Sequence, residues 1–285
     1  MLDISTKLDP FTLEVLTVIS EITNSLGMDF FVIGATARDI IFNLKHGIKI
    51  ERATNDIDFS IRIRSWDDYS TLANTLMENN FYSSKIVHRF TYKSIPSIDI
   101  IPFGEISIDS TYIKWPDKDA KVMSIVGFDE CFDDAESFRI KTNPPLDIKI
   151  ASIRGLVMMK LISWKDGFPT RSRDALDILY IIRNYIEAGN FERLQFEHSD
   201  LVDDNFDFEL TGAILLGRDI SKIANPQTIK VMNAILENEI NDYDNSKFVS
   251  DMMLGISPIY KRDKKTKYFI QLLENLLFGL NENRL

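Results

Sequence analysis

The 285-residue sequence has little of several residue types that mark particular classes of protein. It contains one cysteine, Cys131, so no disulfide can form within the chain, which is typical of a reducing compartment such as the cytoplasm. Its three histidines, His46, His88 and His198, lie far apart, and no pair has the spacing of zinc ligands. Zinc chemistry and histidine-based catalytic triads are therefore disfavoured.

Long apolar runs and an excess of basic residues are also missing. No apolar stretch approaches the roughly 18–20 residues needed to cross a bilayer. The first residues do not have a basic region followed by an apolar stretch, so no signal peptide is expected there. The 33 basic and 43 acidic side chains give a net charge of −10. Binding to duplex DNA rewards clustered cations, so we expect a cytoplasmic protein with no membrane partner and no extensive contact with duplex DNA.

The rest of the composition, 45% hydrophobic and 27% charged, is that of a globular protein, and its pattern divides the chain in two. In the first part, hydrophobic periodicity predicts helices over 10–27, 36–44 and 66–79, and strands over 29–33, 56–64, 86–93, 97–102, 107–113 and 121–127. After Asn143-Pro144-Pro145 it predicts helices over 147–163, 172–187, 209–223, 226–239 and 266–280. The expected fold class is α+β, with an α/β domain over 1–143 and a mainly helical domain over 144–285.

The turn after the predicted strand 29–33 is the first candidate for chemistry. Gly34-Ala35-Thr36-Ala37-Arg38-Asp39 stands where a strand gives way to a helix. The unsatisfied N–H groups and positive dipole of a helix start favour a phosphate there, and Thr36 adds a hydroxyl donor. The same residues also suit an ordinary tight turn in which Thr36 caps the helix.

Two aspartates share one face of the strand predicted over 56–64. Asp56 and Asp58 alternate with Ile57 and Phe59, so both carboxylates project from the polar face while the apolar side chains anchor the strand. Two like charges this close are unfavourable unless a cation lies between them. Hard oxygen ligands suit Mg²⁺ or Mn²⁺ whose coordination is completed by substrate phosphates. The alternative is a polar strand edge that faces solvent.

A third carboxylate is embedded in the apolar strand predicted over 97–102. An unpaired carboxylate among Ile98, Ile100 and their neighbours is costly, so Asp99 lies near a cation or faces water. If this strand neighbours the strand over 56–64, Asp99 completes a set of three carboxylates. Asp109 is the rival for that position.

The segment from Ala151 to Arg173 is the most basic part of this acidic chain, with a local charge of +4. Within it, Lys160 falls in line with Ile153 and Trp164 at helical spacing, so it is expected to point inward and to need an anion. That anion is a phosphate of a bound nucleotide, or the carboxylates of Asp174 or Asp177 on the next helix. A lysine that only covers apolar surface is the remaining alternative.

Taken together, a phosphate-binding turn, clustered carboxylates and an inward lysine suit nucleotidyl transfer, in which an acceptor hydroxyl attacks the α-phosphate of a nucleoside triphosphate (NTP) and pyrophosphate leaves. Four segments carry a family resemblance: Gly34-Ala35-Thr36-Ala37-Arg38-Asp39, Arg52-Ala53-Thr54-Asn55-Asp56-Ile57-Asp58-Phe59, Ile98-Asp99-Ile100-Ile101-Pro102-Phe103-Gly104 and Met159-Lys160-Leu161-Ile162-Ser163-Trp164-Lys165-Asp166. They resemble the DNA polymerase β-like nucleotidyltransferase superfamily, and within it the AbiEii/MenT-type toxins of bacterial toxin–antitoxin systems. The likeness covers about residues 28–187.

The resemblance implies a nucleotidyltransferase-type mixed β-sheet flanked by helices and followed by a mainly helical C-terminal domain. It implies catalytic, metal-binding roles for Asp56, Asp58 and Asp99, with Mg²⁺ or Mn²⁺ as cofactor. The residues that it implies at the NTP are Gly34, Ala35, Thr36, Arg38, Lys160, Asp174 and Asp177. Ala35 departs from the Gly or Ser that is usual in the family, a change that keeps the backbone donors.

The acceptor implied by the resemblance is a tRNA 3′ end or a protein hydroxyl, and a cognate antitoxin is an implied partner. A short tRNA end needs only a few cations. Those available are Arg38, Arg52, Arg154, Lys165, Arg171 and Arg173. The alternatives are a transferase with a small-molecule acceptor, as in antibiotic-modifying relatives, and a catalytically retired scaffold that binds a partner protein.

Overall fold

The structure is a computed structural model that describes residues 1–52, 56–93, 95–116, 122–204, 206–254 and 262–282. It divides into two compact units, Met1–Leu156 and Val157–Leu285. The division lies later than the predicted one after residue 143, because residues 145–150 form a strand of the first unit. The prediction of a helix from residue 147 is therefore wrong at its start, and that helix, α5, spans Ile153–Gly167.

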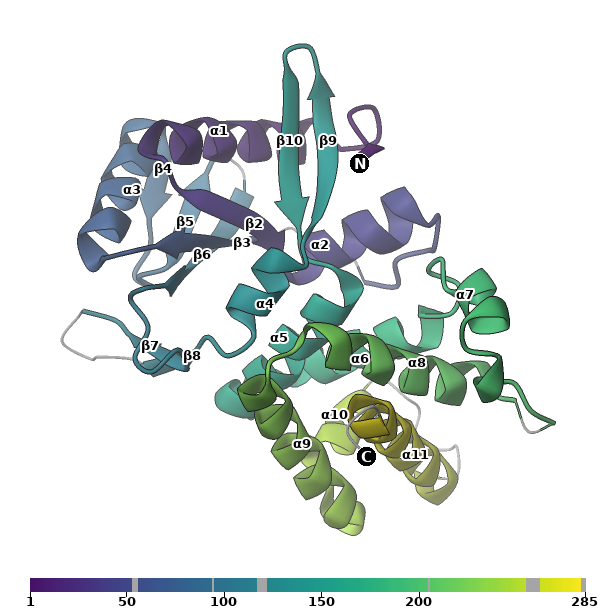
Figure 1. The fold of residues 1–285 in the computed structure, drawn as a ribbon. Helices are drawn as coiled ribbons and strands as arrows, with labels where there is room; N and C mark the ends of the chain where they lie inside the picture. Colours follow the sequence, from purple (N-terminus) through teal and green to yellow (C-terminus); the bar gives the residue numbers. More distant parts are fainter. Residues whose placement is uncertain (53–55, 94, 117–121, 205, 255–261, 283–285) are drawn as a thin grey trace. The chain divides into compact units, whose positions relative to one another are not determined.

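The first unit is built on a mixed sheet of eight strands among the described residues, which confirms the predicted fold class (Figure 1). Their order is β1-β9-β10-β2-β3-β6-β5-β4. The central strands β3 and β6 are parallel to each other, whereas β2 and β5 run antiparallel on either side of them. The strands are β1 (Leu2–Asp3), β2 (Asp29–Ile33), β3 (Ile57–Ile63), β4 (Phe81–Ser83), β5 (Arg89–Tyr92), β6 (Ile95–Gly104), β9 (Glu136–Thr142) and β10 (Pro145–Ile150).

Two short strands outside this sheet, β7 (Tyr112–Lys114) and β8 (Val122–Ser124), form a separate pair. They replace the longer strands predicted over 107–113 and 121–127. A turn occupies the start of the first predicted strand, where Asp109 and Ser110 have positive φ, a backbone conformation incompatible with a regular strand.

The helices of the first unit begin where the sequence provides capping groups. The Asp9 carboxylate accepts hydrogen bonds from two N–H groups at the start of α1 (Pro10–Leu26), and Ser65 forms a capping box with Asp68 at the start of α3 (Trp66–Glu78). Both helices contact the sheet. The short helix α4 (Phe128–Asp133) contacts β6, with the ring of Phe132 edge-on to Phe31 in β2.

The second unit is helical, as predicted. Its centre is the contact between α8 (Phe208–Ile223) and α11 (Arg262–Asn281), where glycines let the backbones approach: a Cβ on Gly279 would lie 2.1 Å from the Ile214 carbonyl oxygen. The remaining helices are α6 (Ser172–Asn184), α7 (Phe191–Phe196), α9 (Pro226–Asn241) and α10 (Lys247–Met252). In the part of the chain that the structure describes, no helix combines the length and apolarity needed to cross a membrane.

Candidate active site

The candidate site begins at a glycine whose conformation and surroundings exclude other residues. β2 ends at Ile33, and α2 (Gly34–Asp39) follows at once and continues into a π-helical turn over Ile40–Lys45. Gly34 has φ of 65°, and a Cβ built on it would lie 2.0 Å from Oδ2 of Asp58. The absence of a side chain therefore lets the Asp58 carboxylate lie directly against the turn.

Four residues that lie directly opposite one another on neighbouring strands form a row across the sheet beside this turn. Ile33 in β2 pairs with Asp58 in β3, Asp58 pairs with Asp99 in β6, and Asp99 pairs with Arg89 in β5. Side chains of directly opposed residues project from the same face of a sheet. The prediction that the strand around Asp99 neighbours the strand over 56–64 is confirmed, so Asp58 and Asp99 lie side by side. The rival Asp109 lies in a turn past the opposite end of β6.

Asp56 precedes β3 and is exposed, and its backbone is tied to the glycine turn. The hydroxyl of Thr36 donates a hydrogen bond to the Asp56 carbonyl oxygen at 3.0 Å. The sequence predicts that this hydroxyl meets a phosphate or caps the helix. It caps no helix N–H, and its hydrogen bond links the turn to Asp56, while the contact with a phosphate stays a prediction. Residues 53–55 of the predicted motif lie outside the described residues.

Arg38 and Ala35 complete the predicted turn. The Arg38 side chain is buried, and its guanidinium donates to the Asp39 carboxylate and, at 2.9 Å, to the Arg52 carbonyl oxygen. Arg38 thus links α2 to Arg52 in the structure. Ala35 is only partly buried and adds no side-chain donor, which leaves its backbone as the group that a phosphate would meet.

Arg89 is a residue of this site that the sequence did not reveal. Its guanidinium grips Asp99 with both ends, Nε to Oδ1 at 2.7 Å and Nη2 to Oδ2 at 2.7 Å. The hydrogen bonds from Asp99 raise the pKa of Arg89, and the charges of Asp56 and Asp58 act in the same direction. The sequence does contain a signal that could have revealed Arg89. If the strands predicted over 86–93 and 97–102 form a hairpin with its turn near residue 94, residues 89 and 99 lie opposite each other.

The donor chemistry of the three aspartates fits a divalent metal ion. Hard carboxylate oxygens from β3, from the residue before it and from the middle of β6 gather beside the start of β3, against a turn with no side chain at Gly34. Within the described ranges, however, no three carboxylate, histidine or cysteine side chains are already grouped as metal ligands. The two hydrogen bonds from the Arg89 guanidinium to the Asp99 carboxylate distinguish these three aspartates from a preformed metal site.

The remaining predicted site residues belong to the second unit. Lys160 in α5 is buried, as its helical spacing predicted, and its Nζ lies 2.7 Å from Oδ2 of Asp177 and 3.2 Å from Oδ1 of Asp174. Burial opposes the charge of Lys160, but the two carboxylates outweigh it and raise the pKa of the lysine. The anion that this inward lysine needs is thus supplied by α6.

Several of the cations considered for an RNA contact are already paired. Arg154 donates to Asp134 at 2.5 and 2.7 Å, and Arg171 donates to Asp174 at 2.6 Å. Lys165 and Arg173 are exposed and make no ion pair with the described part of the chain. The local charge of +4 therefore overstates the positive potential that this segment presents.

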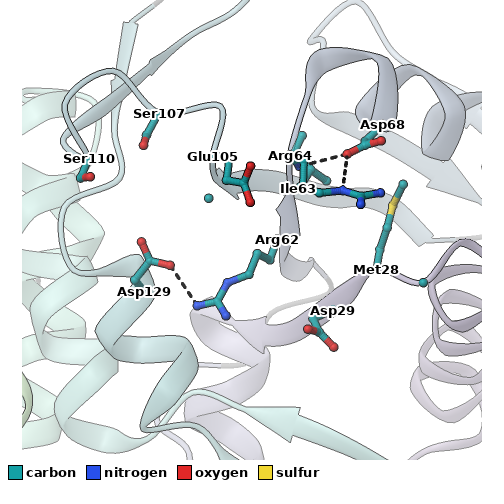
Figure 2. A pocket seen from close by; sticks show the side chains of 12 residues that line it. Met28, Asp29, Arg62, Ile63, Arg64, Asp68, Glu105, Ser107, Ser110 and Asp129 are labelled. Atoms are coloured by element: carbon teal, nitrogen blue, oxygen red, sulfur yellow. Dashed lines mark hydrogen bonds and ion pairs between the residues drawn. The ribbon is translucent and has the colours of Figure 1, made fainter.

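A cavity of about 550 Å³ lies at the other end of the same strands (Figure 2). It is lined by Asp29 at the start of β2, by Arg62 near the end of β3 and by the turn after β6. Figure 2 shows Arg62 directed toward Asp129, with which it forms a hydrogen bond of 2.9 Å. The lining contains none of the predicted site residues, so this cavity is separate from the row of aspartates.

Comparison with known proteins gives a family match. A protein-family model described as the nucleotidyl transferase AbiEii toxin of the type IV TA system matches residues 20–245. No protein with a curated description matches the sequence.

Among solved structures, the chain is similar to the antibiotic-resistance factor ANT(2″)-Ia, at 10% identity over 68% of this chain and 98% of that one, with a TM-score of 0.36. It is also similar to the Thermotoga maritima CCA-adding enzyme complexed with tRNA, at 16% identity over 98% of this chain and 70% of that one, with a TM-score of 0.32. The Elizabethkingia meningoseptica cyclic dinucleotide synthase CdnE is 11% identical over 93% of this chain and 91% of that one, with a TM-score of 0.27.

Proposed function

Because the chain belongs to the AbiEii family of nucleotidyl transferase toxins, we propose that it moves a nucleoside monophosphate from an NTP to an acceptor hydroxyl in a Mg²⁺-dependent reaction. In this reaction the acceptor oxygen bonds to the α-phosphorus, the bond from that phosphorus to the bridging oxygen of the β-phosphate breaks, and pyrophosphate leaves. The family match supports the reaction type, and the row of Asp58 and Asp99 beside Gly34 is the observation that carries the assignment of the site.

The aspartates have distinct roles in the proposed reaction. Asp56, Asp58 and Asp99 would hold the divalent cation, which when bound neutralises phosphate charge and polarises the α-phosphate. Asp99 lies one strand farther from the glycine turn than Asp58, and we assign it to the acceptor side, where its carboxylate takes the proton of the attacking hydroxyl.

The triphosphate is assigned to the backbone of Gly34, Ala35 and Thr36. The first N–H groups of α2 have no carbonyl of a preceding helical turn to bond to, so they can donate to a phosphate. The missing side chain at Gly34 brings this backbone directly against the Asp58 carboxylate. Lys160, with Asp174 and Asp177, is the proposed triphosphate contact of the helical unit. Arg38 supports the triphosphate site indirectly, through its hydrogen bond to the Arg52 carbonyl oxygen.

The proposed acceptor is a tRNA 3′ end or a protein side chain in the cytoplasm, with an antitoxin protein as the partner that restrains the enzyme. Lys165 and Arg173 are exposed cations on which a short RNA end can dock. A small-molecule acceptor is the second candidate among enzymes.

Asp99→Asn tests the proposed function, because it keeps the size of the side chain and removes its charge. We expect NTP affinity in the presence of Mg²⁺, measured by calorimetry, to stay within a few-fold of the parent, while transfer falls by about 10²–10⁴-fold. Asp109→Asn is the matched control and should transfer normally. Failure of the parent to bind any NTP with Mg²⁺ would instead indicate a retired scaffold that binds a partner protein.

A further inference from the structure

We propose that Arg89 is an internal counter-ion of the candidate site, and that it must release Asp99 before this carboxylate can bind a divalent cation. The inference rests on the proposed function and concerns the regulation of the same site. Arg89 would thereby set the metal affinity of the resting enzyme and the order in which the three aspartates engage a metal ion.

The geometry gives Arg89 a firm hold on one carboxylate of the three. Arg89 is the direct cross-strand neighbour of Asp99, so the register of β5 and β6 places the two side chains on the same face. The bond is bidentate, at 2.7 Å for each oxygen, and each oxygen of Asp99 therefore already faces a positive charge. A divalent cation brought to the same oxygens is repelled by the guanidinium unless Arg89 withdraws.

The charge balance explains why such a residue is present. Asp56, Asp58 and Asp99 carry three negative charges beside the start of β3, and like charges so placed repel one another. Arg89 supplies one positive charge, and the charges of Asp56 and Asp58 also act on its guanidinium. When a divalent cation arrives with the NTP, that compensation is no longer required.

The side chain of Arg89 has a route out of the site. It is 36% exposed, whereas the side chain of Asp99 is 17% exposed, so rotation of the arginine toward solvent needs no movement of the strands. Asp99 belongs to a central strand and stays in place, available to a metal ion once the fork opens.

Metal titration tests this inference without any measurement of transfer. Mn²⁺ is titrated into the full-length protein by calorimetry, without NTP, for the parent and for Arg89→Gln, Arg89→Lys, Asp99→Asn and the double variant with Arg89→Gln and Asp99→Asn. We expect Arg89→Gln to bind Mn²⁺ about tenfold more tightly than the parent, because a nearby like charge is removed. Arg89→Lys, which keeps the charge and loses the fork, should lie between the two.

Two controls decide whether the tighter Mn²⁺ binding of Arg89→Gln depends on Asp99. Arg64→Gln removes the same charge from a side chain that is 78% exposed just past the far end of β3, and its Mn²⁺ affinity should stay within about twofold of the parent. The gain in Mn²⁺ affinity caused by Arg89→Gln should largely disappear in the variant that also carries Asp99→Asn. An unchanged affinity in Arg89→Gln, or an equal gain in the Asp99→Asn background, overturns the inference.

Thermal unfolding without metal supplies a second readout. Without Mn²⁺, the Arg89→Gln variant should have a lower melting temperature than the parent. When Mn²⁺ is added, its melting temperature should rise by more than that of the parent, because it binds the ion more tightly. An Arg89→Gln protein that melts like the parent under both conditions contradicts the counter-ion role. Absence of Mn²⁺ binding in the parent and in every variant would overturn this inference, whereas the proposed function fails only if the parent also binds no NTP in the presence of Mg²⁺.

Discussion

Gly34 shows how much of the candidate site depends on one residue. Its positive φ disfavours any side chain, and its Cα faces the Asp58 carboxylate so closely that a Cβ would meet Oδ2 at 2.0 Å. We predict that Gly34→Ala displaces Asp58 and lowers transfer by at least about a hundredfold, in the range of misplaced catalytic groups.

The control for this prediction is Gly47→Ala. Gly47 also has a positive φ, of 71°, but a Cβ added to it would meet nothing within 4 Å, so the substitution carries the backbone strain without the collision. Transfer rates and melting temperatures of the two variants separate the effects. Equal activity in Gly34→Ala and Gly47→Ala would show that the contact with Asp58 does not matter.

Lys160 has two possible roles that a single substitution cannot distinguish. Its removal takes the buried ammonium away from Asp177 and from Asp174, which keeps its ion pair with Arg171, and we predict that Lys160→Met lowers the free energy of unfolding by about 3–5 kcal/mol. The triple variant that also carries Asp174→Asn and Asp177→Asn should recover most of this loss. Urea unfolding of the three proteins measures both changes.

The folded triple variant then reports on the nucleotide. If Lys160 contacts the triphosphate, this variant binds NTP about ten- to a hundredfold more weakly than the parent, the value of a charge-assisted bond. NTP binding equal to that of the parent would leave Lys160 with a structural role only.

Among the elements, helix α8 contributes a buried carboxylate whose ionisation stabilises the helical unit. The side chain of Asp219 is 1% exposed and accepts hydrogen bonds from Tyr185 at 2.6 Å and from Arg193 at 2.8 Å. Burial alone would raise the pKa of Asp219, but these hydrogen bonds lower it to about 2, from 3.8. The stabilisation is therefore fully present above pH 3.8 and is lost as the pH falls through about 2.

We predict that Asp219→Asn lowers the free energy of unfolding at pH 7 by about 2 kcal/mol or more, and that the difference from the parent shrinks below pH 3.8. Urea unfolding at pH 7, 5 and 3 tests the prediction. Asp200→Asn, in which the altered side chain is 56% exposed, should change stability much less. A gap between Asp219→Asn and the parent that does not depend on pH would contradict the assignment.

The elements that the sequence predicts well are those with local signals. α1 and α3 have capping residues at their starts, and β3 has strict alternation of polar and apolar residues, so their bounds fall within a residue or two of the prediction. The prediction of helix at β10 is wrong because its partners, β2 and β9, supply its hydrogen bonds, and no local pattern in six residues reveals them.

The same distinction applies to the candidate site. The pattern around Asp56 and Asp58 predicts a carboxylate face, and the apolar neighbours of Asp99 predict that it needs a cation or water. The identity of that cation, Arg89, depends on strand register, which is set by tertiary contacts. Likewise, the sequence leaves several anions open for Lys160, and only the packing of α5 on α6 selects Asp174 and Asp177.

At the scale of the whole molecule, a net charge of −10 restricts how the protein meets a nucleic-acid acceptor. Arg154 and Arg171 of the basic segment are engaged in ion pairs, so within this segment Lys165 and Arg173 are the exposed cations that the proposed RNA acceptor would meet. This charge pattern suits a short end of an RNA rather than a long duplex.

The central claim, nucleotidyl transfer at the Asp58 site, is tested most directly by following label from each NTP. The protein is incubated with Mg²⁺, total tRNA and cell extract, and with NTPs labelled at the α- or the γ-phosphate. We predict that α-label becomes attached to one class of acceptor, that γ-label leaves as pyrophosphate, and that Asp56→Asn and Asp58→Asn abolish the transfer while Asp109→Asn retains it. Transfer of γ-label to the acceptor, or undiminished transfer by Asp58→Asn, would contradict the account.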